Sequence, residues 1–346
     1  MIETRPQATT LTTSKNASTI NSSIYTTRRE STTKINSSTS LGTTEPIIIT
    51  TNATTTTSGT TTIWTTYDLP FENTYEITED GTIFTTTLSN GVSYSITSPF
   101  TNEETVSALV DYYKDFNFYN LYQYGGETLI YYIKEYIQPV TPKAYNYEKL
   151  KEIHPISDRS LTNPDKMVLF YSHDEVDGVW VYGGTVWQRE HVFPCNLGDF
   201  KRDSTKDSIA WDIFNVRPAD SKVNNVRSDR LYGNVDNPSQ VISKNGTISG
   251  WIDGNYFEAQ DWSKGDCARG CMYVAVAYYH EVYNAKGFNL PININLVFKD
   301  HKTLLEWNNI DEVDALEEQR NRVGQSYQGN RNIFIDFPDI INIIFG

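Results

Sequence analysis

The chain has 346 residues, with 43 acidic side chains against 29 basic ones and a formal net charge of −14. A chain of this length is expected to form about two domains. The acidic balance excludes a protein that binds nucleic acid over its whole surface, because such surfaces are basic. It does not exclude an enzyme that meets phosphate through a local group of arginines and a metal ion.

The first 66 residues are about half threonine and serine, with almost no aromatic residues. Such a segment cannot bury enough apolar surface to fold, so residues 1–66 are predicted to be a disordered stalk or linker. No signal segment with a charged start and an apolar centre opens the chain, and no apolar run is long enough to span a membrane. The stalk-like composition is typical of the cell exterior, so an extracellular or cell-surface location is expected.

Residues 67–104 are predicted to form a short β-rich segment. An Asp-Gly pair at 80–81 and an Asn-Gly pair at 90–91 are turn signals of β-hairpins. Between the turns Thr82–Leu88 is rich in strand-forming residues, and Val92–Ile96 alternates polar and apolar side chains after the second turn. These features predict a small β-meander.

Beyond residue 104 the chain is predicted to hold helices and one buried strand. A continuous apolar run marks the strand at Met167–Tyr171, and apolar residues recur at helical spacing elsewhere. The expected helices cover Glu104–Phe116, Gly126–Tyr136, Gly265–Tyr279, Leu304–Asn308 and Glu318–Arg322. Asp266 is expected in the first turn of the third of these helices, where a carboxylate stabilises the helix dipole.

The chain has three cysteines. Cys267 and Cys271 are four positions apart on the third predicted helix, so they share one face of it. They are packed small apolar residues, free thiols or a strained disulfide. Cys195 has no obvious partner.

Two short segments carry residues that can act on a phosphodiester. The first runs from Trp187 to Pro194 and contains the adjacent pair Glu190 and His191. Neighbouring residues of a strand point to opposite faces, so the two side chains either have different tasks or are brought to one site by a bend. Pro194 ends the strand, because proline cannot continue a hydrogen-bonded ladder.

The second segment runs from Trp211 to Ser228 and, with the first, offers the groups that phosphodiester hydrolysis needs. His191 is a base that is neutral near pH 7 and can take a proton from water. The Glu190 carboxylate and one amide oxygen form a sparse set of hard ligands, which suits Mg²⁺. The amides, and the guanidinium groups that fit phosphate, belong to Asn215, Asn224, Asn225, Arg189, Arg217 and Arg227.

The chain resembles the bacterial endonuclease I family of secreted nonspecific nucleases. The family pattern is Arg-Glu-His-Val-x-Pro, then Asp-Leu-(His or Tyr)-Asn-Leu-x-Pro, five residues and Asn-x-x-Arg-(Ser or Gly). Four segments match family segments in order, at residues 189–194, 212–228, 265–279 and 328–336. Phe214 stands where the family has His or Tyr, and Ile333 replaces a proline. The resemblance covers about residues 105–346.

The resemblance implies an α+β fold in which residues 105–346 form a nuclease domain around a ββα-metal core. It implies that His191 is the general base and that Glu190 and Asn224 are the metal ligands, with Asn225 as the alternative if the alignment shifts by one residue. The other expected catalytic residues are Arg189 and Arg227, and the expected substrate-binding residues are Arg217, Asn215 and Arg269. Arg269 either reaches the phosphate or pairs with Asp266 in a structural role.

The resemblance also implies Mg²⁺ as the cofactor, with Mn²⁺ or Ca²⁺ as alternatives, and DNA or RNA as the partner of a monomer. His191 would take a proton from the attacking water, and Arg227 or Arg217 would hold the cleaved phosphate. Contacts to the nucleic-acid backbone carry no sequence information, so nonspecific cleavage leaving 5′ phosphates is expected. The competing hypothesis, favoured by the stalk and the meander, is a surface adhesin or binding protein whose nuclease-like domain has lost activity.

Overall fold

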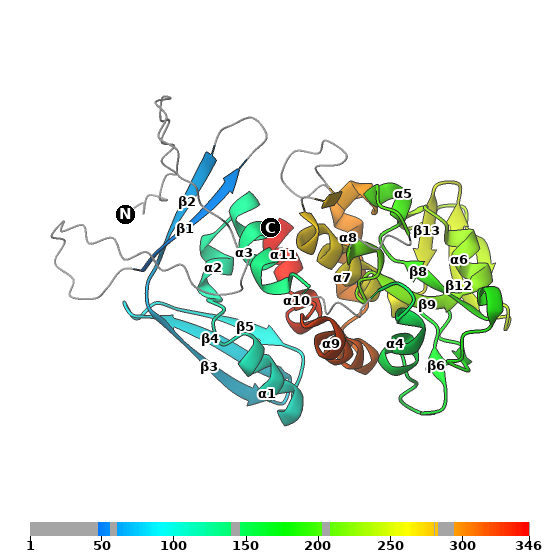
Figure 1. Ribbon diagram of the computed structural model, residues 1–346, viewed down its shortest axis with the longest axis horizontal. Coiled ribbons are helices and arrows are strands. Elements are labelled where there is room, and N and C mark those ends of the chain that lie inside the picture. Colours follow the sequence, from blue (N-terminus) through cyan, green and yellow to red (C-terminus); the bar gives the residue numbers. More distant parts are fainter. Residues whose placement is uncertain are drawn as a thin grey trace. The chain divides into compact units, whose positions relative to one another are not determined.

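The computed structural model has a mixed α+β fold, with many helices and several small sheets (Figure 1). It describes residues 48–55, 61–139, 146–202, 208–279, 281–282 and 294–345, with side chains from residue 69 onward except that of residue 182. The chain divides into two compact units. One comprises residues 1–72 and 87–92, and the other comprises residues 73–86 and 93–346.

The smaller unit contains a hairpin that the composition did not predict. β1 (Ile48–Thr55) and β2 (Thr61–Asp68) pair in antiparallel register. The prediction of disorder over residues 1–66 is therefore corrected for these strands, because β-branched threonine and isoleucine favour extended backbone. The rest of that segment, residues 1–47 and 56–60, lies outside the described residues.

The β-meander predicted after the stalk is present as a three-stranded sheet. Its order is β3–β4–β5, formed by Phe71–Thr78, Gly81–Leu88 and Ser93–Ser98. Gly81 begins the second strand with a φ of +147°, and a Cβ there would lie 2.4 Å from the carbonyl oxygen of Ser98. Glycine is required at this turn because any side chain would force the two strands apart.

The sheet residues of the larger unit share a hydrophobic core with the helices that follow them. Phe84 of β4 packs edge-on against Phe337, with ring centroids 5.2 Å apart, and its centroid lies 5.7 Å from that of Phe118. Phe100 belongs to the same core. The domain boundary near residue 105 stays a prediction, since a shared core does not show which part folds alone.

The larger unit holds the predicted helices together with several shorter ones (Figure 1). They are α1 (Glu103–Tyr112), α2 (Tyr119–Gln123), α3 (Gly126–Ile137), α4 (Leu150–Ser157), α5 (Cys195–Gly198), α6 (Ser221–Arg227), α7 (Asp261–Ala277), α8 (His301–Ile310), α9 (Ala315–Gln328), α10 (Ile333–Asp336) and α11 (Ile340–Phe345). Short 3₁₀ turns are η1 (Tyr182–Gly184), η2 (Ser208–Ala210) and η4 (Ile294–Leu296). Among the described helices, none is long and apolar enough to cross a membrane.

Helix α7 is the central helix of the larger unit. All its residues from Ser263 to Ala277 are buried, and it contacts α3, α8, α10 and β13. It begins at Asp261 rather than at the predicted Gly265, so Asp266 lies in the second turn and not in the first. The carboxylate of Asp266 is used in an ion pair with Arg217 instead of at the helix end.

The strands of the larger unit that follow the meander are short. They are β6 (Met167–Val168), β7 (Glu175–Val176), β8 (Trp187–His191), β9 (Val216–Asp220), β10 (Leu231–Tyr232), β11 (Ser239–Ile242), β12 (Ile248–Asp253) and β13 (Tyr256–Ala259). β6 pairs with β7, β8 pairs with β9, and the other four form a sheet of order β10–β13–β12–β11. The predicted strand at Met167–Tyr171 is therefore shorter than expected, although its later residues are buried.

Candidate functional site

The candidate site is built from β8, β9 and α6. The two strands pair antiparallel, so that Glu190 lies opposite Arg217. β9 ends at Asp220, whose carboxylate accepts hydrogen bonds from backbone N–H groups in the first turn of α6 and so caps that helix. α6 contacts both strands. This arrangement brings the two sequence segments of the motif together.

Both segments line one pocket of about 830 Å³. β8 contributes Arg189, Glu190 and His191, and α6 contributes Asn224 and Asn225. The rest of the wall consists of Tyr147, Trp180, Gly183, Gln188, Pro194, Cys195, Asn196, Phe200, Lys201, Arg202, Ser228 and Asp229. The adjacent Glu190 and His191 therefore reach one site, which was one of the two alternatives left open by the sequence.

One nitrogen of the His191 ring is hydrogen-bonded to the backbone. Its Nε2 lies 2.9 Å from the carbonyl oxygen of Ala210, which can only accept a hydrogen bond. Nε2 therefore carries the proton, and Nδ1 has no hydrogen-bond partner among the described residues. Burial lowers the pKa of His191 to about 4, and the nearby guanidinium groups of Arg202 and Arg189 act in the same direction. The ring is neutral at pH 7 with a free lone pair on Nδ1.

Aromatic rings fix the plane of the imidazole. The Tyr147 ring lies nearly parallel to that of His191, at 14° and with centroids 5.8 Å apart. Phe200 meets the imidazole at 61°, with centroids 5.6 Å apart. Because the two rings lie at different angles to the imidazole, they restrict its rotation and keep its orientation.

Glu190 is buried and only one of its oxygens is used by the protein. Its Oε1 accepts hydrogen bonds from the Tyr171 hydroxyl at 2.9 Å and from Arg227 at 3.1 Å. Burial raises the pKa of Glu190 to about 7, against the opposing effect of the Arg227 guanidinium. One arginine and one hydroxyl thus compensate the carboxylate charge only in part, which favours a further cation at this side chain.

Arg227 is fully buried and does not line the pocket. Besides Glu190, its guanidinium donates to the backbone carbonyl oxygens of His191 at 3.0 Å and Val192 at 2.8 Å. These contacts tie α6 to the end of β8 and hold the Glu190 carboxylate in place. The predicted catalytic role of Arg227 stays a prediction.

The residues present fit a hard cation bound by two protein oxygens. Nδ2 of Asn224 donates to Oε1 of Gln188 at 3.2 Å, and Oδ1 of Asn224 has no partner among the described residues. Oε2 of Glu190 also has no partner among them, because both hydrogen bonds of this carboxylate go to Oε1. A carboxylate oxygen and an amide oxygen suit Mg²⁺, which keeps most of its waters. Asn225 lines the same pocket but is exposed. Within the described ranges, no group of three or more His, Cys, Asp or Glu side chains could hold a metal ion.

Arg189 is the pocket arginine of the predicted set. Its guanidinium stacks over the Tyr147 ring, with 3.6 Å between Cζ and the ring centroid, and donates to the carbonyl oxygen of Tyr147 at 2.5 Å. It also lies 3.2 Å from a carboxylate oxygen of Glu148. The side chain is therefore oriented before any ligand binds.

Several pocket residues had no part in the sequence-based prediction. Lys201 and Arg202 are exposed and line the pocket, and they add two positive charges at its rim. Two adjacent basic residues, seven positions after the Trp187–Pro194 segment of an acidic chain, are a sequence signal that could have identified them. The aromatic wall, formed by Tyr147, Trp180 and Phe200, comes from three separate loops and has no local signal.

All three cysteines are free. Cys267 and Cys271 are fully buried in α7, so they are packed core residues, one of the alternatives given by their spacing. Cys195 lines the pocket, and burial raises the pKa of its thiol to about 12. It remains a protonated thiol at neutral pH and is a poor nucleophile.

Comparison with known proteins agrees with this arrangement of residues. The family model described as Endonuclease I matches residues 127–339, a range that contains the whole pocket wall. The chain belongs to the endonuclease I family.

Its relatives carry nuclease names. The chain is 34% identical over 198 residues to a protein named extracellular ribonuclease from Bacillus subtilis (strain 168), covering 53% of this chain and 62% of the relative. A protein of the same name from Bacillus amyloliquefaciens is 34% identical over 194 residues, with the same coverage. A protein named Endonuclease-1 from Buchnera aphidicola subsp. Acyrthosiphon pisum (strain APS) is 27% identical over 160 residues, covering 45% of this chain and 58% of the relative. The chain thus spans less than two thirds of the length of these relatives.

Asn215, which belongs to the endonuclease I motif, lies outside the pocket wall. Its Nδ2 donates to the carbonyl oxygen of Ile209 at 2.9 Å, and its Oδ1 accepts from the backbone N–H of Phe193 at 2.9 Å. The side chain therefore joins the segment after β8 to η2. Its predicted contact with substrate stays a prediction.

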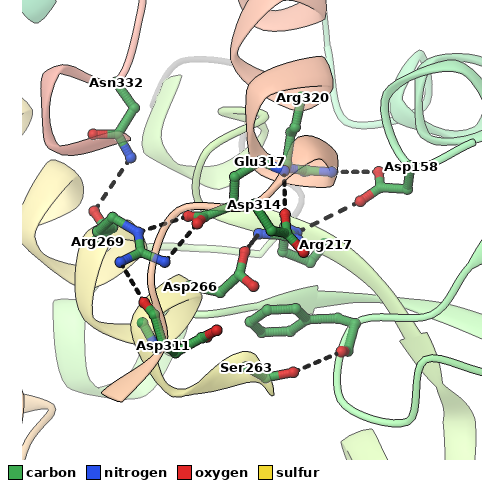
Figure 2. A network of polar contacts seen from close by, with 12 residues as sticks. Asp158, Arg217, Ser263, Asp266, Arg269, Asp311, Asp314, Glu317, Arg320 and Asn332 are labelled. Carbon is green, nitrogen blue, oxygen red and sulfur yellow. Dashed lines mark hydrogen bonds and ion pairs between the residues drawn. The ribbon is translucent and has the colours of Figure 1, made fainter. Parts of the chain in front are cut away.

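Arg217 is engaged by carboxylates behind the strand pair (Figure 2). It donates to Asp266 at 2.8 Å, and its Nε lies 3.6 Å from Oδ1 of Asp158. The other oxygen of Asp158 pairs with Arg320 of α9, which also donates to the carbonyl oxygens of Ile213, before β9, and of Val216, at its start. The network joins β9, α4, α7 and α9, and the predicted substrate contact of Arg217 stays a prediction.

Arg269 is part of the same polar network (Figure 2). Its Nε donates to Glu317 at 2.9 Å and its Nη1 to the carbonyl oxygen of Asp311 at 2.8 Å. The ion pair with Asp266 that the sequence suggested is not formed, because α9 brings Glu317 to the guanidinium instead. A Cβ at Gly265 would lie 2.0 Å from the carbonyl oxygen of Asp311, so glycine allows this close approach. The predicted phosphate contact of Arg269 stays a prediction.

Proposed function

We propose that this protein is a metal-dependent endonuclease that hydrolyses phosphodiester bonds of DNA or RNA without sequence preference. The ββα-metal core of the proposal consists of β8, β9 and α6. The observation that carries it is the meeting of three groups in one pocket: a neutral histidine with a free Nδ1, and two oxygens, from Glu190 and Asn224, without a protein partner.

Glu190 and Asn224 are the proposed ligands of Mg²⁺, with Mn²⁺ or Ca²⁺ as alternatives. A bound Mg²⁺ polarises a phosphate group and offsets the negative charge that develops during its hydrolysis. Arg227 is proposed to act through Glu190, because it fixes one oxygen of the carboxylate and leaves the other for the ion. Such orientation of a ligand by its neighbours commonly decides metal affinity.

His191 is the proposed general base. Its Nδ1 takes the proton of the attacking water, and the imidazolium that forms is stabilised by the hydrogen bond from Nε2–H to Ala210. Arg189, Lys201 and Arg202 are proposed to bind the phosphates of the substrate, since they are the cations of the pocket wall. Their contacts would be to the nucleic-acid backbone, which makes cleavage nonspecific.

The names of the relatives support a nucleic-acid substrate and an extracellular location. Two relatives are named extracellular ribonuclease and one is named Endonuclease-1. We propose that this protein acts outside the cell, as a monomer, on DNA or RNA. The alternative is a surface adhesin or binding protein whose nuclease-like domain is inactive.

A plasmid-nicking assay separates the two functions. The purified chain is incubated with supercoiled plasmid and, separately, with a labelled single-stranded RNA, in Mg²⁺ and in EDTA. Cleavage of either substrate in Mg²⁺ but not in EDTA supports the proposal. No cleavage in Mg²⁺, Mn²⁺ or Ca²⁺ by a chain that is folded by circular dichroism would contradict it and favour the inactive alternative.

A further inference from the structure

A second cavity, of about 400 Å³, adjoins the candidate active site. Its wall consists of Lys151, Pro155, Arg159, Pro164, Asp165, Lys166, Met167, Gly178, Val179 and Trp180. Trp180 lines both this cavity and the pocket that holds His191, so the two hollows meet at one side chain.

Trp180 is a preformed platform at this junction. Its ring stands edge-on to Trp187, at 87° and with centroids 4.7 Å apart. Gly184 has a φ of +65°, and a Cβ there would lie 3.1 Å from the tip of the indole. At the other end of the loop, a Cβ on Gly178 would lie 2.7 Å from the Cβ of Pro155. The close packing of both glycines fixes the loop, while Trp180 remains only half-buried.

Three basic side chains and one acidic side chain, Asp165, line the second cavity. Lys151 and Arg189 lie over the Trp180 ring, 4.8 Å and 5.0 Å from its centroid, and Lys166 pairs with the exposed Asp177. Arg159 is exposed, and its guanidinium has no charged partner among the described residues. Lys151 also pairs with Glu148, and Asp165 lines the cavity, so Arg159 is the one of the three cations without an ion-pair partner among the described residues.

We propose that the second cavity is a nucleotide subsite for the single strand that flanks the cleaved bond. An unpaired base would stack on the part of Trp180 that faces the cavities, and the adjoining phosphate would meet Lys151, Arg159 and Lys166. Stacking on an aromatic ring beside a cationic groove is how proteins hold single strands without reading their sequence. The inference rests on the proposed nuclease function and adds a preference for longer, single-stranded substrates.

The chemistry of the cavity distinguishes this occupant from an acidic peptide. The carboxylates of an acidic peptide would also pair with the cations. They would not stack on the half-buried Trp180 ring, which lines both cavities, whereas a nucleotide base would. A duplex fits the subsite poorly, because its bases are already stacked on one another and cannot reach the ring. The length dependence of binding is therefore the property to measure.

The test uses the full chain in EDTA, so that binding is measured without cleavage. Kd values for a labelled dinucleotide and a labelled dodecanucleotide, both single-stranded DNA, are obtained by fluorescence anisotropy over a range of salt. The ratio of the two Kd values is the advantage of length. Arg159→Ala is compared with Lys302→Ala, which also removes one exposed positive charge but lies on α8 and lines neither cavity.

The subsite predicts that Arg159→Ala reduces the advantage of length and lowers the slope of log affinity against log salt by about 1, as expected for a lost phosphate contact. Trp180→Leu should weaken dodecanucleotide binding by about 5- to 160-fold, the range for one base–aromatic stack, while Trp180→Phe should retain most of it. Equal melting temperatures of the two Trp180 variants would show that the difference is not a folding defect.

The proposal is overturned if Arg159→Ala and Lys302→Ala have the same advantage of length and the same salt slope. It is also overturned if a duplex gains as much affinity from length as the single strand does, or if an acidic peptide competes as well as the dodecanucleotide. A wild-type chain that neither binds nor cleaves nucleic acid would instead remove the proposed nuclease function, and this outcome is distinguishable from a failed subsite.

Discussion

Nε2 of His191 lies 2.9 Å from the carbonyl oxygen of Ala210, 19 residues later in the chain. This contact selects the tautomer of the imidazole, because a carbonyl oxygen has no proton to donate. Nε2 is therefore occupied, and Nδ1 is the nitrogen of this pocket residue that can accept a proton. The first prediction follows from this contact.

His191→Ala should reduce plasmid cleavage by roughly 10²–10⁴-fold, the usual range for loss of a general base. The fold should be kept, as judged by circular dichroism, because the substitution removes only one hydrogen bond to Ala210. His301→Ala, an exposed histidine on α8, is the control and should cleave like the wild type. Near-normal turnover by the folded His191 variant would remove the assignment.

The proposed metal ligands can be tested by substitution, with the neighbouring Asn225 as a control for Asn224. Glu190→Gln and Asn224→Ala should weaken Mg²⁺ binding, measured by isothermal calorimetry, together with cleavage. A site with two protein ligands has little redundancy, so both losses should be large. Asn225→Ala should change both quantities much less, since that side chain is exposed. If Asn225→Ala is the damaging change and Asn224→Ala is not, the ligand is one residue further along.

The network around Arg269 predicts a loss of stability rather than of phosphate binding. Arg269→Ala would leave the carboxylate of Glu317, 1% exposed, without its ion-pair partner. The free energy of unfolding in urea should fall by about 3–5 kcal/mol, the usual effect of breaking a buried pair. The double variant Arg269→Met with Glu317→Leu should lose less, because no buried charge is left alone. A stable Arg269→Ala protein with a higher KM for nucleic acid would instead support the phosphate contact.

His154 predicts that the protein loses stability in mild acid. The side chain is fully buried, and neither ring nitrogen has a hydrogen-bond partner among the described residues. Burial lowers its pKa from 6.5 to about 4, although Asp158 lies 3.7 Å away and opposes the shift. Between these two values the unfolded chain binds a proton that the folded chain does not, so the free energy of unfolding falls as the pH falls.

The contribution of His154 to this loss of stability in acid can be measured by substitution. His154→Phe should remove about 2 kcal/mol of the stability difference between pH 7 and pH 5, measured by urea unfolding at each pH. His191 has a similarly lowered pKa and leaves part of the pH dependence in place. An identical loss in the wild type and the His154→Phe variant would show that His154 titrates normally.

The N-terminal residues should not be needed for cleavage. A chain that begins at Phe71 lacks the predicted stalk but keeps the β3–β5 sheet, and we expect its cleavage rate to lie within a few-fold of that of the full chain. A chain that begins at Thr105 also loses Phe84, Ile96 and Phe100 from the hydrophobic core. It should melt at a lower temperature, because burial of each such side chain contributes roughly 1.5–3 kcal/mol. Equal melting temperatures would place the domain boundary at Thr105.

The amino-acid sequence by itself determined the identity of the central residues and the elements that carry them. The two hairpin turns follow from local rules, since they depend on neighbours a few positions away. The strand before Pro194 was also expected, but β8 ends at His191, three residues earlier than the proline rule placed its end. The start of α7 was placed too late because Trp262 is the one apolar side chain among its first four residues, which gives no apolar period. The strands β1 and β2 were missed because their threonine-rich composition is also typical of disordered segments.

Only the tertiary structure decided which side chains share the pocket and which are used elsewhere. Arg189 and Arg217 stand on paired strands and look alike in sequence, yet the first stacks on Tyr147 in the pocket and the second pairs with Asp266 behind it. These partners lie 42 and 49 residues away along the chain. Local patterns do not encode contacts over such separations, because those contacts are set by the packing of α4, α7 and α9 around the strand pair.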